Sequence, residues 1–528
     1  MTEFICTNDS PIVKVKQGLV KGYYFKGVYR FFGIPYARSR RFEMPQEPRN
    51  WDGIRNCNAY GYICPILSSP APSDEISVPH RFWPENEHCQ NLNVYTDTIN
   101  EDKKKPVLVW LHGGGFSAGS AIEQVAYDGD SLALNDDVVV VTINHRLNAF
   151  GFLDVSAFGD KFKYSGTVGM ADIVAALKWV HENIANFGGD PENVTVFGQS
   201  GGGHKVWALG QIAEADGLFH KGIIMSGVSQ DTTDQKGLVS GKDFTLKIME
   251  IAGVSNIEEL QKLNYQLYIM AVNKASAFFM EQGLHYAWEP RANGYFYGNP
   301  FSVGFREHFL TVPTIVGTCA SDISLPETTP HKCELSEEEQ TQKVCEFFGE
   351  EKGRILVEKF KKAYPGRPVI FAKCMDMVFT KDSDRFVREK SAGTAPVYRY
   401  QFGPVFDIDG GKSAWHCSDI GFAFHNVDIL PYCYSIPYAK RLEKEFCQAV
   451  VSFARTGDPN HADLPEWKPS DKDNVYTMFF DEKTEVRVNF DNDVLNYFLE
   501  NMPKRDTSFW RRKTEGPDDE PPTGSWAY

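Results

Sequence analysis

Continuous runs of apolar residues in the first half of the chain predict strands that are buried on both faces. The two longest are VLVWLH (107–112) and VVVVTINH (138–145). A strand covered by helices on both sides shows such a run instead of an alternation, which favours a mostly parallel sheet. Further strands of this kind are predicted at NVTVFGQ (193–199), GIIMSG (222–227) and VPTIVGTC (312–319).

Helical periodicity separates these runs. Apolar residues recur at 3.6-residue spacing from Ala171 to Phe187, which predicts an amphipathic helix that ends at FGGDP. Charged helices are expected from Ser336 to Tyr364, and one long helix from Ile436 to Gly457. Because strands alternate with helices, we predict an α/β fold with a large, mostly parallel central sheet covered by helices on both faces.

The two ends of the chain have different patterns. PIVKVKQGLVKGYYFKGVYRFFGIPYA (11–37) contains short β-rich runs separated by glycines and predicts an antiparallel meander. The segment 511–528 is polar and proline-rich, which is typical of a loosely held tail. We see no internal repeat and no break in composition. We therefore expect one domain over residues 1–510, with large helical insertions, followed by the tail.

Composition and charge exclude several classes of function. The 528 residues are 42% hydrophobic and carry a formal net charge of −15, which argues against nucleic acid or an anionic membrane as partner. We find no apolar run of about 18 residues and no signal-peptide pattern, so we expect no membrane span and a cytoplasmic location. Secretion is the alternative if the N-terminus was trimmed. The eleven cysteines form no CxxC pair, and we expect neither a structural metal nor a cofactor.

The segment Gly198-Gln199-Ser200-Gly201-Gly202 matches the pattern G-x-S-x-G between a predicted strand and a predicted helix. In that context it predicts a nucleophile elbow, in which a strained turn presents the serine hydroxyl. Glycines at 198 and 202 would avoid clashes with the strand and the helix, and the helix would direct its free N–H groups at the serine. A serine in an ordinary glycine turn is the alternative.

A second glycine-rich segment, WLHGGGF (110–116), follows a predicted buried strand. Successive glycines can bring backbone N–H groups close to a ligand, as an oxyanion hole requires. We expect Gly114, Gly115 and Gly201 to be its donors and His112 to be a packed histidine. A flexible turn is the alternative, but the combination with the serine motif favours the oxyanion hole.

Together with these two motifs, several longer stretches resemble the type-B carboxylesterase and cholinesterase family of α/β-hydrolases, over nearly the whole chain. They are FFGIPYA (31–37), RRFEMP (40–45), NEHCQNLNVYT (86–96), GMADIVAALKWVHENIANFGGDPENVTVFG (169–198) and the late helix PYAKRLEKEFCQAVVSFARTGDPN (437–460). The resemblance implies an α/β-hydrolase fold, with the large sheet described above, and hydrolysis of carboxylic esters through an acyl-enzyme intermediate.

A serine nucleophile needs a base and an orienting carboxylate, which follow it in α/β-hydrolases in the order acid, then histidine. We expect His416 to be the base because SAWHCSDIGFAF is similar to the family's H-G-x-E/D element, with Cys417 in place of the glycine. His425 is the alternative base and is expected to be packed.

Asp322 is the expected acid. It lies in TIVGTCASDIS, after a predicted strand, where the family usually carries a glutamate. Asp419, to which the resemblance gives a supporting position, and Glu327 are the rivals. The chain departs most from the family pattern here.

The resemblance also bears on the substrate. Gln199 replaces a glutamate of cholinesterases, and a neutral amide removes a charge that would favour a cationic alcohol group. We expect an uncharged, hydrophobic ester or a xenobiotic as the small-molecule partner. The aromatic residues of GYFYGNPF (294–301) either line an acyl pocket or belong to the core.

The same resemblance implies structural pairs. Arg41 with Glu87 and Arg146 with Asp172 occupy positions of family salt bridges. Cys64 and Cys89 match a family disulfide, which we expect to be reduced in this chain.

Three other functions are compatible with the sequence. They are an acyltransferase that uses the same triad, a sequestering protein that is acylated quickly and turns over slowly, and a non-catalytic scaffold. A homodimer through the C-terminal helices is considered as a further partner.

Overall fold

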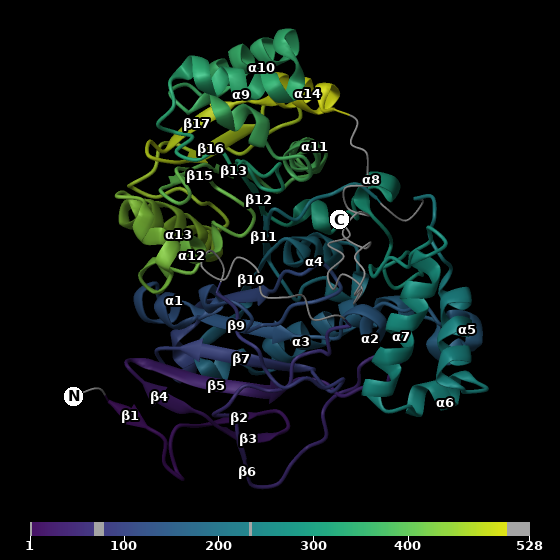
Figure 1. Ribbon diagram of the computed structural model, residues 1–528. Helices are drawn as coiled ribbons and strands as arrows, with labels where there is room; N and C mark the ends of the chain where they lie inside the picture. The colour runs from purple at the N-terminus through teal and green to yellow at the C-terminus, as the bar shows by residue number, and fades with distance from the viewer. Residues whose placement is uncertain (1–2, 68–78, 232–234, 504–528) are drawn as a thin grey trace.

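Residues 3–67, 79–231 and 235–503 are described by a computed structural model (Figure 1). Its centre is a 12-stranded sheet, β1-β4-β5-β7-β9-β8-β10-β11-β12-β13-β16-β17. In this spatial order the strands are β1 Phe4–Ile5, β4 Tyr23–Phe25, β5 Val28–Pro35, β7 Asn91–Thr96, β9 Val139–Asn144, β8 Lys105–Leu111, β10 Gly189–Gln199, β11 Lys221–Met225, β12 Thr314–Cys319, β13 Val397–Phe402, β16 Tyr476–Phe480 and β17 Glu485–Val488.

The strand order confirms the predicted mostly parallel sheet. From β9 through β16 each strand pairs in parallel with its neighbour. Antiparallel pairs flank this part on both sides. Every residue of β8 and β9 is buried, as their continuous apolar runs predicted. The carboxyl ends of the parallel strands therefore meet at one edge, where ligands bind in open α/β sheets.

The predicted N-terminal meander is divided between two sheets. Strand β2 (Ile12–Val15) pairs with β3 (Gly18–Lys21) in a small sheet that also contains β6 (Ile54–Asn56). The next hairpin, β4–β5, joins the large sheet. Gly22 lies between the two, and a Cβ there would be 2.1 Å from the carbonyl oxygen of Arg30. A short ladder of β14 (Val405–Phe406) and β15 (Lys412–Ser413) completes the strands.

Helices cover both faces of the large sheet (Figure 1). Alternate residues of β8 point to opposite faces. Val109 packs in one core cluster with residues of α3 and α4, whereas Trp110 packs in another with residues of α1, α12 and α13. The helices are α1 Asp130–Asn135, α2 Asn148–Gly151, α3 Val168–Asn183, α4 Gly201–Gly210, α5 Gly241–Ala252, α6 Ile257–Lys262, α7 Tyr265–Met280, α8 Pro300–Val303, α9 Glu337–Phe348, α10 Glu350–Ala363, α11 Thr380–Lys390, α12 Ile420–Ala423, α13 Ala439–Thr456 and α14 Asn492–Asn501.

The predicted helices are present, with shifted ends. The helix predicted from Ala171 to Phe187 is α3, and a 3₁₀ turn continues it over Ile184–Phe187. The charged region 336–364 forms α9 and α10, which Gly349 separates with a φ of 87°. The long helix is α13, and Gly457 ends it in a left-handed conformation.

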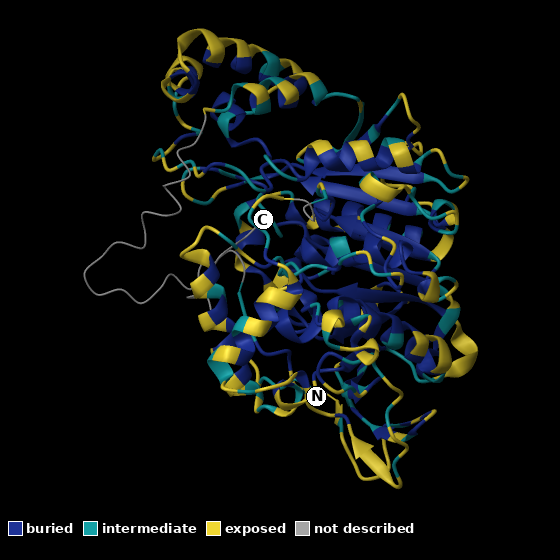
Figure 2. Cartoon of the chain, turned by 90° about the vertical axis from the view of Figure 1, so that its right-hand side faces the viewer, coloured by how far each residue is buried: buried dark blue, intermediate teal, exposed yellow. Residues whose placement is uncertain are grey.

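The helical insertions have cores of their own. Residues of α5 and α7 share one apolar cluster, and residues of α9, α10 and α14 share another. In Figure 2 the outer helices have exposed faces, while the central strands are buried. Among the described residues, none of the helices has both the length and the apolar character for a membrane crossing. The tail predicted for 511–528 lies outside the described residues.

Candidate active site

Ser200 lies at the sharp turn between β10 and α4. Its φ of 57° and ψ of −128° are strained for a residue with a Cβ. The Ser200 N–H donates a hydrogen bond of 2.9 Å to the carbonyl oxygen of Met225 on β11. The side chain therefore stands at the carboxyl edge of the parallel strands, in the conformation that a nucleophile elbow requires.

The glycines around Ser200 are required by close backbone packing. A Cβ at Gly198 would lie 2.5 Å from the carbonyl carbon of Gly202. A Cβ at Gly202 would lie 2.0 Å from the carbonyl oxygen of Leu111. No side chain fits at either position, which is the reason that the sequence pattern suggested.

The second glycine segment packs directly on this turn. We call residues 113–115 the tri-glycine loop; it follows β8, and Gly114 and Gly115 have φ values of 82° and 59°. A Cβ on Gly201 would be 2.4 Å from the backbone nitrogen of Gly115. A Cβ on Gly113 would be 3.5 Å from the Cβ of Ser200. The three expected donors thus belong to backbone segments that pack against each other beside the serine.

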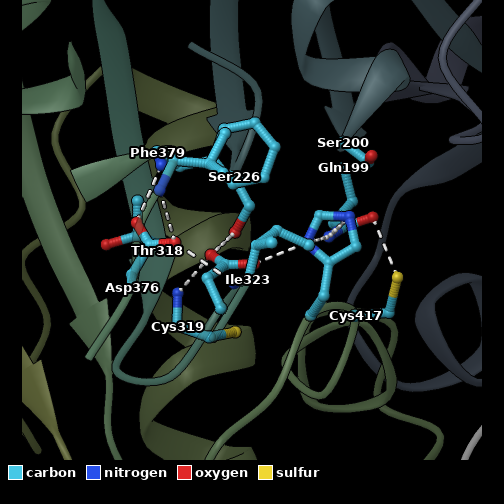
Figure 3. Close-up of polar contacts among 12 residues, drawn as sticks. Gln199, Ser200, Ser226, Thr318, Cys319, Ile323, Asp376, Phe379 and Cys417 are labelled. Carbon is cyan, nitrogen blue, oxygen red and sulfur yellow. Dashed lines mark hydrogen bonds and ion pairs between the residues drawn. The ribbon is translucent and has the colours of Figure 1, made fainter. Parts of the chain in front are cut away.

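His416 and Asp322 lie together although 94 residues separate them. The ring nitrogen Nδ1 of His416 makes a short hydrogen bond with Asp322 Oδ1. The backbone N–H of His416 also donates to the backbone carbonyl oxygen of Asp322, at 3.1 Å. The other carboxylate oxygen accepts the N–H of Cys319 at 2.8 Å and the hydroxyl of Ser226 (Figure 3). These bonds fix the carboxylate, which in turn can fix the imidazole tautomer.

Gln199 connects the serine turn with the histidine loop. Its amide nitrogen lies 3.1 Å from His416 Nδ1 and 3.3 Å from Nε2. Its amide oxygen accepts a hydrogen bond of 3.1 Å from the Cys417 thiol (Figure 3). Sequence reasoning assigned Gln199 only an effect on the alcohol group and missed this contact. In the sequence, the replacement of the family's glycine by Cys417 was the signal that a side chain at this position makes a contact of its own. The φ of Cys417 is 78°.

Phe379 and Asp376 support the same site and were also missed. The Phe379 ring stacks on His416, with centroids 5.4 Å apart and an interplanar angle of 8°. The Asp376 carboxylate accepts backbone N–H groups of Phe379 at 2.8 Å and Ile323 at 3.1 Å (Figure 3). Burial and the nearby Asp322 raise its pKa to about 6. Asp376 thereby links the loop that carries the acid to the ring that covers the histidine.

The rival residues have other partners. His425 Nδ1 lies 2.8 Å from Asp136, which is the main reason that its pKa is raised. Asp419 accepts the Tyr400 hydroxyl at 2.7 Å, and burial raises its pKa to about 7. Glu327 forms a salt bridge of 2.5 Å with Lys373.

His112 is fully buried, as expected for a packed histidine. Its ring stacks on that of His145, with centroids 5.0 Å apart. Burial lowers the pKa of both rings well below the usual value, with the Lys205 charge as the second cause. His112 is therefore neutral at pH 7.

Both structural ion pairs are present. Arg41 lies 2.9 Å from Glu87, and Arg146 lies 2.8 Å from the buried Asp172.

The other two structural expectations concern cysteines and aromatic residues. Cys64 and Cys89 are free thiols, and burial raises the pKa of Cys89. Of the aromatics considered for an acyl pocket, Tyr295 and Phe296 pack in the core, whereas Tyr297 is 53% exposed.

Comparisons with known proteins give a consistent result. A profile described as the carboxylesterase family matches residues 9–498. The para-nitrobenzyl esterase of Bacillus subtilis is 31% identical over 498 residues, which cover 90% of this chain and 96% of that protein. Carboxylesterase 1D of Rattus norvegicus is 30% identical over 523 residues, with 89% of each chain covered.

A solved structure is similar over a comparable length. It belongs to an esterase from the anaerobe Clostridium hathewayi that is described as able to hydrolyse aliphatic aromatic polyesters. The TM-score is 0.89 and the sequence identity 40%, over 95% of this chain and 100% of that one.

Proposed function

The chain belongs to the carboxylesterase family and is a carboxylic ester hydrolase, and from this premise we propose which of its residues carry out the reaction. Ser200 is the nucleophile, His416 the general base and Asp322 the orienting acid. Backbone N–H groups of Gly114, Gly115 and Gly201 form the oxyanion hole. The single observation that carries the proposal is the hydrogen bond between His416 Nδ1 and Asp322. The same imidazole ring contacts Gln199, the residue directly before Ser200.

The reaction follows from these roles. Because Nδ1–H donates to Asp322, the lone pair of His416 is on Nε2, which takes the Ser200 proton as the oxygen attacks the ester carbonyl. The tetrahedral oxyanion accepts hydrogen bonds from the glycine N–H groups. His416 then gives its proton to the leaving alcohol. Water, activated by the same ring, releases the acid and restores the serine.

We infer that the preferred substrates are uncharged esters with hydrophobic or aromatic groups. Gln199 beside the nucleophile is neutral, so the site lacks the negative charge at this position that would favour a cationic alcohol. The names of two relatives agree with this preference, since one is called a para-nitrobenzyl esterase and the other is described as acting on aliphatic aromatic polyesters.

Ester profiling tests this function. We expect hydrolysis of p-nitrophenyl and naphthyl esters of several chain lengths, with a kcat/KM at least about tenfold above that for choline esters of the same acids. Ser200→Ala is the control that separates the enzyme from a contaminating esterase. A preference for choline esters would contradict the substrate class, and equal rates for Ser200→Ala would contradict the assigned nucleophile.

We further propose that Cys64 and Cys89, whose side chains contact each other, stay reduced, as in a cytoplasmic environment. Thiol titration of the denatured, unreduced protein checks this. Eleven titrated thiols are expected, and nine would indicate a disulfide.

We also propose one domain over residues 1–510 and a homodimer through the C-terminal helices. A single cooperative unfolding transition tests the first, and light scattering tests the second.

A further inference from the structure

A lysine is buried beneath the tri-glycine loop. Lys205 lies on α4, in the helix that begins directly after Ser200, and its side chain is fully buried. Its ammonium donates hydrogen bonds to the carbonyl oxygen of His112 at 3.0 Å and to that of Gly115 at 2.8 Å. The first carbonyl directly precedes the loop and the second belongs to its last residue. Lys205 therefore holds the loop at both ends.

The loop needs such support for a physical reason. Glycine loses more conformational freedom on folding than any other residue, so three in succession do not hold one conformation by themselves. Helical side chains point toward the helix N-terminus, which directs Lys205 back toward the loop. An ammonium offers three N–H donors and no acceptor. It can bond two carbonyls at once without competing for the N–H groups that face the substrate.

The surroundings of Lys205 contain little that compensates its charge. His112 and His145 face it from the ends of β8 and β9, and His204 lies on the same helix. Glu123 attracts the ammonium across space, but burial dominates and lowers the lysine pKa to about 7. The side-chain nitrogen of Lys205 is thus held by the two backbone carbonyls, and its neutral form also has enough N–H donors for both.

We propose that Lys205 is a positioning residue for ester hydrolysis, which holds the tri-glycine loop in the conformation that directs its N–H groups at the substrate carbonyl oxygen. This inference rests on the proposed oxyanion hole. It assigns to Lys205 no contact with the substrate and no proton transfer.

The chain offers a matched control. Lys390, at the end of α11, is also fully buried, and its ammonium donates to the carbonyl oxygens of Phe309 at 2.7 Å and Val312 at 2.8 Å. These carbonyls belong to the 3₁₀ turn Phe309–Thr311 and the residue after it, which carry none of the proposed catalytic groups. A methionine at either lysine position removes the charge and the donors but keeps the length of the side chain.

The test compares wild type, Lys205→Met and Lys390→Met. Turnover of a p-nitrophenyl ester gives kcat and KM. A trifluoromethyl ketone measures the oxyanion site separately, because the serine oxygen adds to its carbonyl carbon, the serine proton passes to the histidine, and the former carbonyl oxygen becomes an oxyanion. For Lys205→Met we expect kcat to fall about 10- to 100-fold, less than for the loss of a direct oxyanion donor, with KM within about threefold. The inhibitor should weaken by the same factor as kcat.

Lys390→Met should leave kcat and inhibitor affinity within about twofold of wild type, because the turn that it supports is not catalytic. Folding of each variant is checked by circular dichroism. If Lys205→Met does not fold, Lys205→Gln serves in its place, since it retains an N–H donor and lacks the charge. A folded variant at position 205 with wild-type kcat and inhibitor affinity would overturn the inference, as would an equal loss in Lys390→Met.

Failure of the proposed function is distinguishable from failure of this inference. If Ser200→Ala abolishes turnover while Lys205→Met is fully active, the nucleophile stands and the role of Lys205 is wrong. If Ser200→Ala is active, the proposed site itself is wrong.

Discussion

Two buried lysines make the same contacts in two different regions of the molecule. Lys205 and Lys390 each bury an ammonium, each donate to two backbone carbonyls, and each lie near a phenylalanine ring, at 5.5 Å and 4.4 Å from the centroid. Burial lowers the pKa of both to about 7. Their burial and their hydrogen bonds are alike, so we expect a functional difference between them to come from the segment that each one holds.

The segment held by Lys205 is surrounded by strained and converging groups. Ser200 has a positive φ, Gly198 and Gly202 have no room for a Cβ, and the bonded pair of His416 and Asp322 approaches from later strands. Nothing comparable is proposed around Lys390. Burial and an altered pKa therefore do not by themselves identify a catalytic region. Substitutions near Lys205 should change rate, and those near Lys390 should change only stability.

The largest expected effect is that of Ser200→Ala. Loss of the nucleophile should lower kcat for a p-nitrophenyl ester by about 10⁵-fold or more, because the rest of the triad cannot act without it. The melting temperature should change little, since alanine keeps the Cβ. Steady-state kinetics and differential scanning fluorimetry measure the two quantities. Substantial remaining turnover would remove the basis for a catalytic region around Lys205.

Asp322→Asn comes second. An amide cannot orient the imidazole in the same tautomer, so kcat should fall by about 10⁴-fold with a small change in KM. His425→Gln is the matched control, because it removes a histidine from another carboxylate, Asp136, outside the proposed triad. Comparable losses of kcat in the two variants would contradict the distinction between the regions.

The pH dependence of stability should be the same for both lysines. Their pKa values are lowered from 10.5 to about 7, so the unfolded chain binds more protons between those values. Stability should therefore rise with pH in this window, by about 1.4 kcal/mol per pH unit for each lysine. Below pH 7 both states carry the charge, and the penalty of burial is fully present.

Urea unfolding at pH 7.5 and 9.0 checks this expectation. Wild type should gain more stability between the two pH values than either Lys205→Met or Lys390→Met, by a similar margin. If only one of the two variants lost part of this pH-dependent gain in the free energy of unfolding, burial would affect the two lysines differently, which would contradict the expectation.

Cys417→Gly should have the smallest effect. Glycine accepts the φ of 78° without strain, so the free energy of unfolding should rise by up to about 1 kcal/mol. Loss of the thiol contact to Gln199 should change kcat by less than about threefold, because that contact supports His416 only indirectly. Asp409→Gly, at a φ of 52° in an exposed turn, is the control for stability alone. A larger kcat change in Asp409→Gly than in Cys417→Gly would contradict this expectation.

Much of the fold was predictable because its signals are local. The apolar runs of β8 and β9 and the periodicity of α3 depend on neighbouring residues. The glycines around Ser200 also follow from a local constraint, the sharp turn from strand to helix. The division of the N-terminal meander was not predictable, since it depends on which sheet each hairpin joins.

The side-chain contacts of the site were less accessible. Gln199 meets His416 across 217 residues, and Asp376 meets the backbone of Ile323 across 53. No periodicity reports such pairs. Lys205 was missed for a further reason, because a lysine on a helix is usually exposed. Its burial depends on the position of the tri-glycine loop, which only the three-dimensional structure provides.

Covalent labelling shows directly whether Ser200 is an activated nucleophile. A fluorophosphonate reacts with a serine that has an activated hydroxyl and an oxyanion site, and mass spectrometry of the digested protein locates the adduct. We predict one phosphonyl group per chain, on Ser200, with ester hydrolysis lost in proportion to labelling and no adduct in Ser200→Ala. An adduct on another residue, or full hydrolysis by fully labelled protein, would contradict the account.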